Sequence, residues 1–286
     1  MNVTKRALLR ALSAAVAAPT LLVAGCATPE AGDDAYRPSI GQPGKDVMWV
    51  PTLDALAVPM LEAAGVTERD LVYDLGSGDG KLPILAARRY GARAVGIEYD
   101  ARLSALAQRN AERAGVTDRV RMIHGDIFRE DFSAATVVAL YVGQDLNLKL
   151  RPTLLAMRPG TRVVSNLFDM GTWEPDRVIR VPDQNPAYLW VVPARVEGEW
   201  EIAGLPEGGP ATLRLAQTFQ KVTGTLVLAG RPAAEVEGRL EGTRLVVELP
   251  AARGPARRIV GEVEGAAFRG GLEGDPARAV IGRRVR

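Results

Sequence analysis

The residues with the clearest chemical pattern are a glycine-rich loop and two acids that follow it. The loop Asp74-Leu75-Gly76-Ser77-Gly78-Asp79-Gly80 closes a short apolar run, Glu98 ends a second run, and Asp126 follows a third. Glycines let the backbone approach a ligand without an intervening Cβ, and a helix beginning after the loop directs N–H groups toward it. Glu98 lies 20 residues after Gly78, a distance at which an acid can bind ribose hydroxyls. The pattern therefore predicts a nucleoside site.

The glycine spacing excludes the common dinucleotide site. Gly76-x-Gly78-x-Gly80 lacks the two-residue gap of the dinucleotide fingerprint, and the loop holds no Lys-Ser or Lys-Thr phosphate cradle. No basic residue precedes Lys81 in the loop. We therefore expect a nucleoside with a short zwitterionic or cationic tail rather than a pyrophosphate.

The composition narrows the possible partners. One cysteine and one histidine in 286 residues exclude a multi-histidine metal site and any site built from several cysteines, so we expect no metal. A formal net charge of +2 and an aromatic content of 5% give neither an electrostatic nor a stacking reason to expect a nucleic-acid partner. A hydrophobic content of 47% is enough to build a core.

Strands and helices alternate over residues 46–193. The expected strands are 71–75, 93–99, 120–124, 136–142, 161–168, 177–181 and 187–192. The expected helices are 52–64, with Thr52 as N-cap, then 82–90, 101–114 and 145–157. This order predicts an α/β fold with a doubly wound, mainly parallel sheet of seven strands. Only residues 182–186 separate the last two strands, which predicts an antiparallel hairpin at one edge.

The loop and the spaced acids resemble the motifs of class I S-adenosylmethionine-dependent methyltransferases, over residues 46–193. The resemblance implies S-adenosyl-L-methionine as cofactor and a binding site formed by Asp74, Gly76, Ser77, Gly78, Asp79, Gly80, Glu98, Asp126 and Ile127. The loop glycines would pack against the methionine part, with Asp74 or Asp79 near its amino group. Glu98 would bind the ribose, and Asp126 with Ile127 would hold the adenine.

A narrower resemblance concerns the small lysine methyltransferases that act on ATP synthase c-subunit and adenine nucleotide translocase, with their bacterial relatives. It rests on the segment 73–81, on Trp49-Val50-Pro51-Thr52, and on Trp173-x-Pro175-Asp176 before Tyr188-Leu189-Trp190. It implies N-methylation of a protein lysine. The chain departs from those enzymes at residues 140–144, where they carry a motif containing Phe and Pro.

Methyl transfer requires an aligned nucleophile and, for a lysine acceptor, loss of a proton. Polar residues that follow the fourth and fifth expected strands could assist; the catalytic candidates are Tyr141, Asn166 and Asp169, with Gln144 and Asn147 also considered. Tyr141 is the first choice because it ends the fourth strand. The alternative for each is an ordinary loop or capping hydrogen bond. His124, inside a strand and without an evident partner, is expected to be structural.

The first residues resemble the signal of bacterial lipoproteins. Three cations precede a 14-residue apolar run that ends in Leu22-Val23-Ala24-Gly25-Cys26. We expect a signal peptide over 1–25, lipidation of Cys26, a flexible tether over 26–45, and membrane anchoring in the bacterial cell envelope. Removing residues 1–25 would change the formal charge from +2 to −1. If the signal is not used, the location is cytoplasmic.

Residues 194–286 lose helical periodicity and show eight short alternating segments separated by turn signals. These predict an antiparallel meander that forms a small barrel or a half-open sheet. We expect this domain to stabilise or dimerise the chain; the alternative is a module that holds a ligand. The export signal also leaves a second function open: a lipoprotein that binds a nucleoside-like ligand through the methyltransferase fold without turnover.

Overall fold

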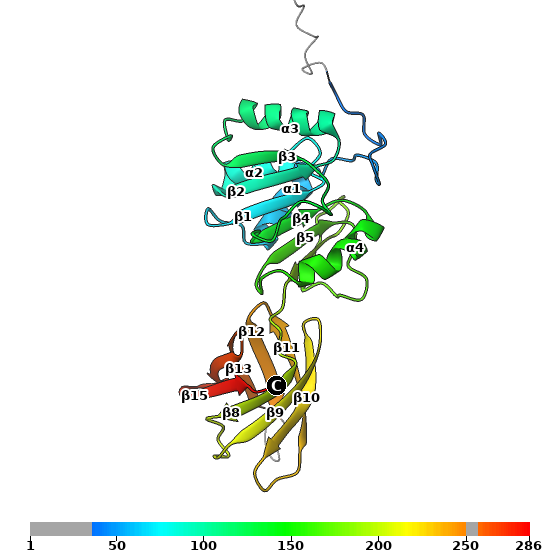
Figure 1. Cartoon of the computed structure of the whole chain (residues 1–286). Helices are drawn as coiled ribbons and strands as arrows, with labels where there is room; N and C mark the ends of the chain where they lie inside the picture. Colours follow the sequence, from blue (N-terminus) through cyan, green and yellow to red (C-terminus); the bar gives the residue numbers. More distant parts are fainter. Residues whose placement is uncertain (1–35, 250–256) are drawn as a thin grey trace, which may run out of the picture. The chain divides into compact units, whose positions relative to one another are not determined.

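The computed structural model describes residues 36–249 and 257–286, which form a sheet part and a barrel part (Figure 1). The expected signal peptide, Cys26 and the first part of the expected tether lie outside the described residues. No helix in the described part of the chain combines the length and apolarity needed to cross a membrane.

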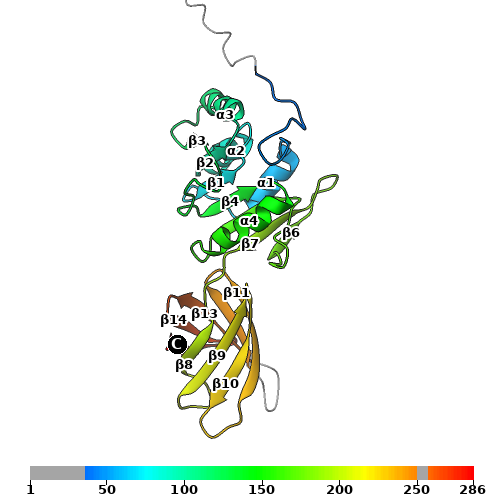
Figure 2. The same cartoon turned by 45° about the vertical axis from the view of Figure 1, so that its right-hand side comes forward.

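The sheet part comes first in the chain. The described residues form seven strands in it, in the order β3-β2-β1-β4-β5-β7-β6. The strands are β1 (Leu71–Leu75), β2 (Arg93–Glu98), β3 (Val120–His124), β4 (Val137–Leu140), β5 (Arg162–Asn166), β6 (Arg177–Ile179) and β7 (Ala187–Val191). The first five are parallel, whereas β7 runs antiparallel to both β5 and β6. Figure 2 shows β6 and β7 side by side. The doubly wound sheet and its antiparallel edge are confirmed.

Helices cover both faces of the sheet. Successive residues of a strand point to opposite faces, and here both faces carry apolar side chains that must be buried. The helices are α1 (Asp54–Ala63), α2 (Lys81–Tyr90), α3 (Ala101–Arg113) and α4 (Gln144–Leu155). Along β4, Val137 and Ala139 join the core cluster with α1–α3, whereas Val138 and Leu140 join the cluster with α4. The two apolar layers hold the strand ends in fixed positions, which is what a site at those ends requires.

The predicted N-cap of α1 is wrong. In the described structure Leu53 occupies the N-cap position and makes no side-chain cap hydrogen bond. The Thr52 hydroxyl instead accepts a hydrogen bond from Asn166 Nδ2 (3.3 Å). This contact ties the entry of α1 to the end of β5.

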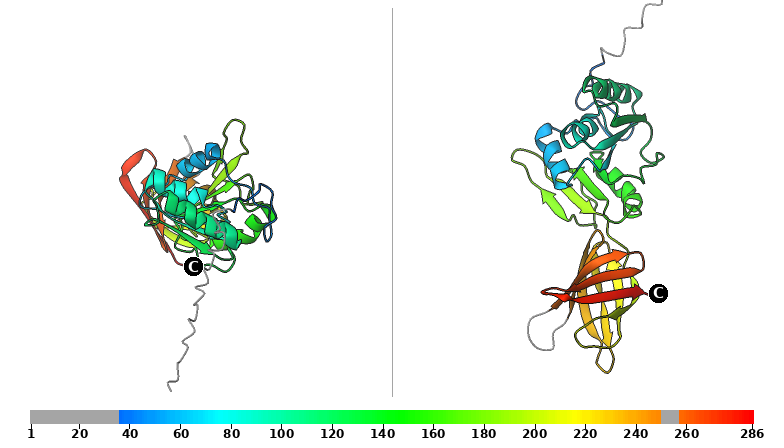
Figure 3. Two further views of the ribbon diagram at one scale, coloured as in Figure 1. Left: turned by 90° about the horizontal axis from the view of Figure 1, so that it is seen from above. Right: turned by 90° about the vertical axis from the view of Figure 1, so that its left-hand side faces the viewer.

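The second part is a closed barrel in which the described residues supply eight antiparallel strands (Figure 3). They are β8 (Gly198–Ala203), β9 (Ala211–Thr218), β10 (Lys221–Leu228), β11 (Ala234–Glu241), β12 (Arg244–Leu249), β13 (Arg257–Glu264), β14 (Ala267–Leu272) and β15 (Asp275–Arg284). β15 pairs with β8 and closes the barrel. Alternate side chains form an apolar interior around Trp200 and Leu240. Closure pairs every strand, so that the meander has no open edge.

Candidate functional site

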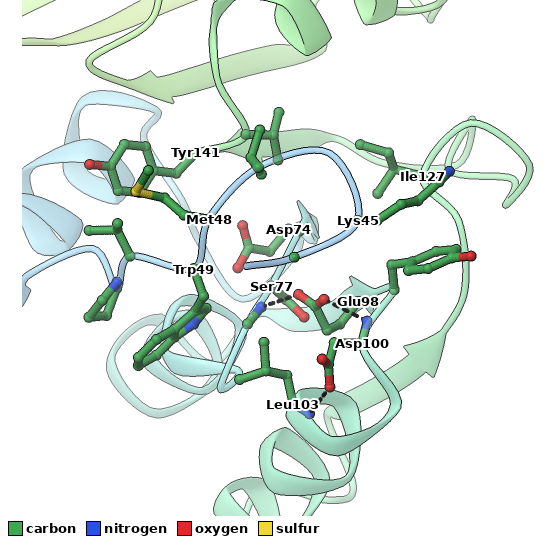
Figure 4. Close-up of a pocket in the computed structure, with 18 of the residues that line it drawn as sticks. Lys45, Met48, Trp49, Asp74, Ser77, Glu98, Asp100, Leu103, Ile127 and Tyr141 are labelled. Atoms are coloured by element: carbon green, nitrogen blue, oxygen red, sulfur yellow. Dashed lines mark hydrogen bonds between the residues drawn. The ribbon is translucent and has the colours of Figure 1, made fainter. Parts of the chain in front are cut away.

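A pocket opens at the carboxyl ends of the parallel strands, where the strand order reverses between β1 and β4. Ligands in doubly wound sheets bind at this point. The loop after β1, the end of β2, the turn after β3 and the residues after β4 line the pocket, together with residues 42–52. Figure 4 shows Asp74 in the middle, with Met48 beside Tyr141 on one side and Lys45 near Ile127 on the other.

Residues 41–49 form a small hairpin that supplies one wall of the pocket. Gly41 N–H donates to Trp49 O, Trp49 N–H donates to Gln42 O, and each bond is 2.9 Å long. Its tip carries Lys45, whose ammonium lies 2.9 Å from Asp126 Oδ2 and 4.7 Å from the centre of the Tyr99 ring. The end of the expected tether is thus folded against the pocket.

The hairpin also explains why the loop needs glycine. Gly78 has φ +55°, and a Cβ on it would lie 2.5 Å from Trp49 Nε1. At Gly76, with φ +79°, a Cβ would lie 2.6 Å from Val142 Cγ1. The loop is therefore packed closely between the hairpin and the residues after β4.

Replacing Gly78 by alanine should weaken binding of S-adenosylmethionine, the cofactor that the sequence motifs imply, by about tenfold or more, because Trp49 must move away from the loop. Gly115→Ala is the matched control. Gly115 also has a positive φ, +66°, but a Cβ there meets nothing within 4 Å. Both variants carry the left-handed backbone strain of about 1–2 kcal/mol. Calorimetric titration with S-adenosylmethionine measures the difference, and equal affinities of the two variants would show that the clash has no effect.

Glu98 is held at the end of β2 by two backbone donors. Gly78 N–H donates to Glu98 Oε2 (2.8 Å), and Asp100 N–H donates to Glu98 Oε1 (2.9 Å). Each carboxylate oxygen keeps a lone pair that can accept a hydroxyl of a ligand. Burial raises the pKa of Glu98, and the two backbone N–H groups oppose this shift. The arrangement suits recognition of a vicinal diol.

Asp74 is a buried acid at the centre of the pocket, with 7% of its surface exposed. Burial raises its pKa to about 8, and the negative charges of Glu98 and Asp79 contribute in the same direction. Burial also raises the pKa of Asp79, although the Lys81 N–H and charge oppose it. A cationic group of a ligand would relieve this accumulation of negative charge.

Asp126 and Ile127 lie at the other end of the pocket, after β3. Phe128 N–H donates to Asp126 Oδ1 (2.9 Å), and this bond together with Lys45 lowers the pKa of the carboxyl group. The aliphatic side chains of Ile127 and Leu103 supply apolar surface among the lining residues. This end can therefore accept a flat apolar ring with a polar edge.

The predicted catalytic residues lie at different depths. Tyr141 lines the pocket, and burial raises its pKa. Asn166 is buried beside the pocket through its bond to Thr52, and its Oδ1 has no partner among the described residues. Asp169 is exposed and does not line the pocket; it accepts a bond from Gln144 Nε2 (2.8 Å).

Asn147, also considered as an assistant, and His124, expected to be structural, both have structural partners. Asn147 is buried and its Nδ2 donates to Ser165 Oγ and to Phe168 O, both at 3.0 Å. His124 Nε2 lies 3.0 Å from Tyr99 O, and the residue is not among those that line the pocket. The structural interpretation of His124 agrees with this placement.

Sequence reasoning assigned no role to several pocket residues, namely Lys45, Met48, Trp49, Tyr99, Asp100 and Leu103. Trp49 belongs to the Trp-Val-Pro-Thr motif that supports the narrower resemblance, but the sequence did not indicate that this motif lines the pocket. Asp100 both caps α3, through the Leu103 N–H (3.0 Å), and orients Glu98. Residues 36–249 and 257–286 hold no group of three His, Cys, Asp or Glu side chains placed to bind a metal.

Residues 74–177 match the family model described as the ANTKMT methyltransferase domain. The chain is also 41% identical to a protein-lysine N-methyltransferase of Saccharolobus islandicus over 151 residues, which make up 51% of this chain and 94% of that protein. The chain belongs to the class I S-adenosylmethionine-dependent methyltransferases. The fold and the sequence motifs that predicted this family are thereby confirmed.

Two more relatives of this methyltransferase widen the comparison. The crystal structure of an RNA methyltransferase from Salinibacter ruber with S-adenosyl-L-homocysteine shares 49% identity, with a TM-score of 0.50, over 51% of this chain and 96% of that one. The adenine nucleotide translocase lysine N-methyltransferase of Mus musculus is 36% identical over 110 residues, or 38% of this chain. The chain covers 48% of that protein, about half its length.

The pocket of this methyltransferase fits its cofactor, S-adenosylmethionine. The buried carboxyl group of Asp74 faces other acids, and the cofactor carries a sulfonium and an ammonium group. Ser77 lines the pocket as part of the glycine loop, while its buried Oγ lies against Gly96 of β2, where a Cβ would approach it to 2.6 Å. Glu98 presents free lone pairs where a ribose needs them. Asp74 therefore suits the cationic methionine part of the cofactor, and Glu98 suits its ribose.

Proposed function

We propose that this methyltransferase N-methylates a lysine of a protein. The single observation that carries the proposal is the 41% identity to the Saccharolobus islandicus protein-lysine N-methyltransferase over 94% of that protein's length. The mouse relative, whose name also specifies a lysine, supports the same acceptor. The pocket adds a physical reason, because the Tyr141 hydroxyl on its wall can accept a hydrogen bond from an amine.

Each part of the cofactor has residues that suit it. Glu98 binds the two ribose hydroxyls, Asp126 and Ile127 hold the adenine, and the glycine loop packs on the methionine part. Asp74 lies near the cationic groups and becomes ionised when they bind. The cofactor supplies an electrophilic methyl group. The protein must orient the amine and exclude water.

The chemistry left to this chain is the handling of the acceptor amine. A lysine ammonium must release one proton to water before its lone pair can attack. The half-buried Tyr141 hydroxyl lines the pocket and can accept an N–H of the neutral amine. Asn166 is buried behind Thr52 and is not among the lining residues, so we assign it no direct contact with the amine. Desolvation in the pocket also lowers the pKa of the ammonium. Together these effects favour a neutral, oriented nucleophile.

Incubation with S-adenosylmethionine labelled in the methyl group, a protein extract and an RNA extract tests the acceptor. We expect label in protein, with methylated lysine identified by mass spectrometry after digestion. Tyr141→Phe should lower kcat by about tenfold, because the hydroxyl no longer orients the amine, while cofactor affinity stays within about twofold. The phenylalanine keeps the ring that stacks on Phe168 at 6.0 Å.

Label that enters RNA and not protein would reject the lysine proposal, while leaving the methyltransferase assignment in place. Arg88→Ala is a suitable control, because Arg88 is an exposed residue of α2 outside the pocket lining. That variant should transfer methyl groups at the rate of the unaltered protein. A Tyr141→Phe protein with unchanged kcat would remove Tyr141 from the reaction.

A further inference from the structure

The barrel contacts the sheet domain through the turn between β9 and β10. Phe219, at φ +55°, places its ring 6.2 Å from Trp173 in a stacked arrangement. Gln220, which is 1% exposed, donates to Glu174 O (2.7 Å), and Lys221 Nζ donates to Glu174 Oε1 (2.8 Å). All these partners belong to residues 167–176, the segment that joins β5 to β6; we call it the β5–β6 segment.

A second barrel strand reaches the end of the same segment. Arg239, on β11, donates to Asp176 Oδ1 (2.6 Å), and the other oxygen of Asp176 accepts the Val191 N–H (2.9 Å). Asp176 is therefore fixed from the barrel and from β7 together. The Trp-x-Pro-Asp motif, which the sequence singled out without a role, is the part of the sheet domain that the barrel holds.

The other end of the β5–β6 segment reaches the reacting side of the pocket. The Phe168 ring stacks on that of Tyr141, a pocket residue, with ring centres 6.0 Å apart. The Asp169 carboxylate accepts a hydrogen bond from Gln144. Arg151 of α4 contacts both the β5–β6 segment and the barrel turn. Its Nη1 donates to Met170 O (2.7 Å), while its guanidinium lies 5.8 Å from the centre of the Phe219 ring.

The Phe219 ring thus contacts both Trp173 and Arg151. Trp173 is fully buried, and Trp190 Nε1 donates to its carbonyl (2.8 Å). Removing the Phe219 ring would expose one face of Trp173 and loosen Arg151, its neighbour. Loss of packing at one end of a short segment increases local opening along its length.

We propose that the Phe219–Lys221 turn of the barrel positions the β5–β6 segment, and through Phe168 sets the Tyr141 wall that meets the methyl acceptor. Phe219 is a positioning residue, since it touches neither the pocket nor the acceptor. The statement about the acceptor rests on the proposed function. The Saccharolobus islandicus relative aligns over 94% of its length with only 151 residues, so it has no room for a second domain of this size. The barrel is therefore an addition to the shared catalytic unit.

Hydrogen exchange of the full chain, with and without S-adenosylmethionine, tests this placement. In Phe219→Ala we expect amides of residues 167–173 to exchange about tenfold faster, with other segments of the sheet domain unchanged. Phe219→Tyr keeps the ring and should restore slow exchange. Arg214→Ala is the control, because it removes an exposed barrel ion pair with Glu199 and leaves the turn intact.

The same variants separate positioning from general support. With a methyl acceptor, Phe219→Ala should raise KM for the acceptor severalfold while cofactor affinity stays constant. Arg239→Gln removes the bond to Asp176 and is a second variant, usable even if Phe219→Ala does not fold. Unchanged exchange in residues 167–173 in both variants, or a uniform increase across both domains, would overturn the proposal. Exchange is measured without an acceptor, so its result is independent of whether the acceptor is a lysine.

Discussion

Glu98→Ala should reduce the affinity for S-adenosylmethionine by about 1–3 kcal/mol, which corresponds to about 5- to 150-fold. Two losses add together. The ribose hydroxyls lose their acceptor, and the Gly78 and Asp100 N–H groups lose the carboxylate that fixes them at 2.8 and 2.9 Å. The loop after β1 is then less well ordered before the cofactor binds. Isothermal titration with S-adenosylmethionine and with S-adenosylhomocysteine should show the same loss, because both ligands carry the ribose.

Glu68→Ala is the control for this substitution, since Glu68 is exposed and does not line the pocket. Its affinity should equal that of the unaltered protein. Thermal unfolding without ligand separates binding from stability: Glu98→Ala should remain folded, because burial already disfavours its charge. An affinity within about twofold of the unaltered protein would remove Glu98 from ribose binding.

The sheet and the position of its site could be predicted because both depend on local patterns. Each of the five parallel strands is a short, mainly apolar run with a glycine or the start of a helical repeat close to one of its ends. Glu98 and Asp126 come at strand ends, so parallel pairing alone brings them to the same edge as Gly78. The antiparallel strands of the second part followed from alternation, although the sequence left a barrel and a half-open sheet as alternatives. The turns at Gly242 and Gly265 have the positive φ that tight hairpins require.

The hairpin at 41–49 could not be predicted in the same way. Its first five residues, 41–45, end a stretch that is rich in Gly, Pro, Asp and Ala and that the sequence predicts to be a flexible tether. The conformation of the hairpin depends on contacts with residues far away in the sequence. Examples are Lys45 with Asp126, 81 residues later, and Trp49 with Gly78. The same limit applies to Trp173 and Asp176. Their motif is visible in the sequence, but its partners Phe219 and Arg239 come from another domain.

Cofactor affinity should rise with pH because of Asp74. Its pKa of about 8 means that the free protein at pH 7 holds this acid mostly protonated. A bound sulfonium and ammonium favour the ionised form, so binding at pH 7 should release close to one proton from this site. If the bound-state pKa lies well below 6.5, affinity should increase about 25-fold between pH 6.5 and pH 8.5. Titration calorimetry in two buffers of different ionisation enthalpy measures both quantities.

Asp74→Asn distinguishes the titration of this acid from that of the cofactor's own amino group. The amino group loses its proton near pH 7.7–8.0, roughly the value of a free α-amine. The variant should bind more weakly at pH 8.5, and any dependence on pH that it keeps belongs to the ligand. S-adenosylhomocysteine, which lacks the sulfonium charge, should show a smaller rise with the unaltered protein. Equal pH profiles for Asp74→Asn and the unaltered protein would show that Asp74 does not ionise on binding.

The same pKa shift sets the opposite trend for the free protein. An unfolded aspartate ionises near pH 3.8, whereas folded Asp74 holds its proton to about pH 8. Folding therefore becomes less favourable through this group as pH rises from about 4 to about 8. The cofactor reverses the trend by placing a cation near Asp74, whose pKa is otherwise raised by burial and by the charges of Glu98 and Asp79. Thermal unfolding at pH 6.5 and 8.5 should thus show a larger stabilisation by S-adenosylmethionine at the higher pH, and Asp74→Asn should lose most of that difference.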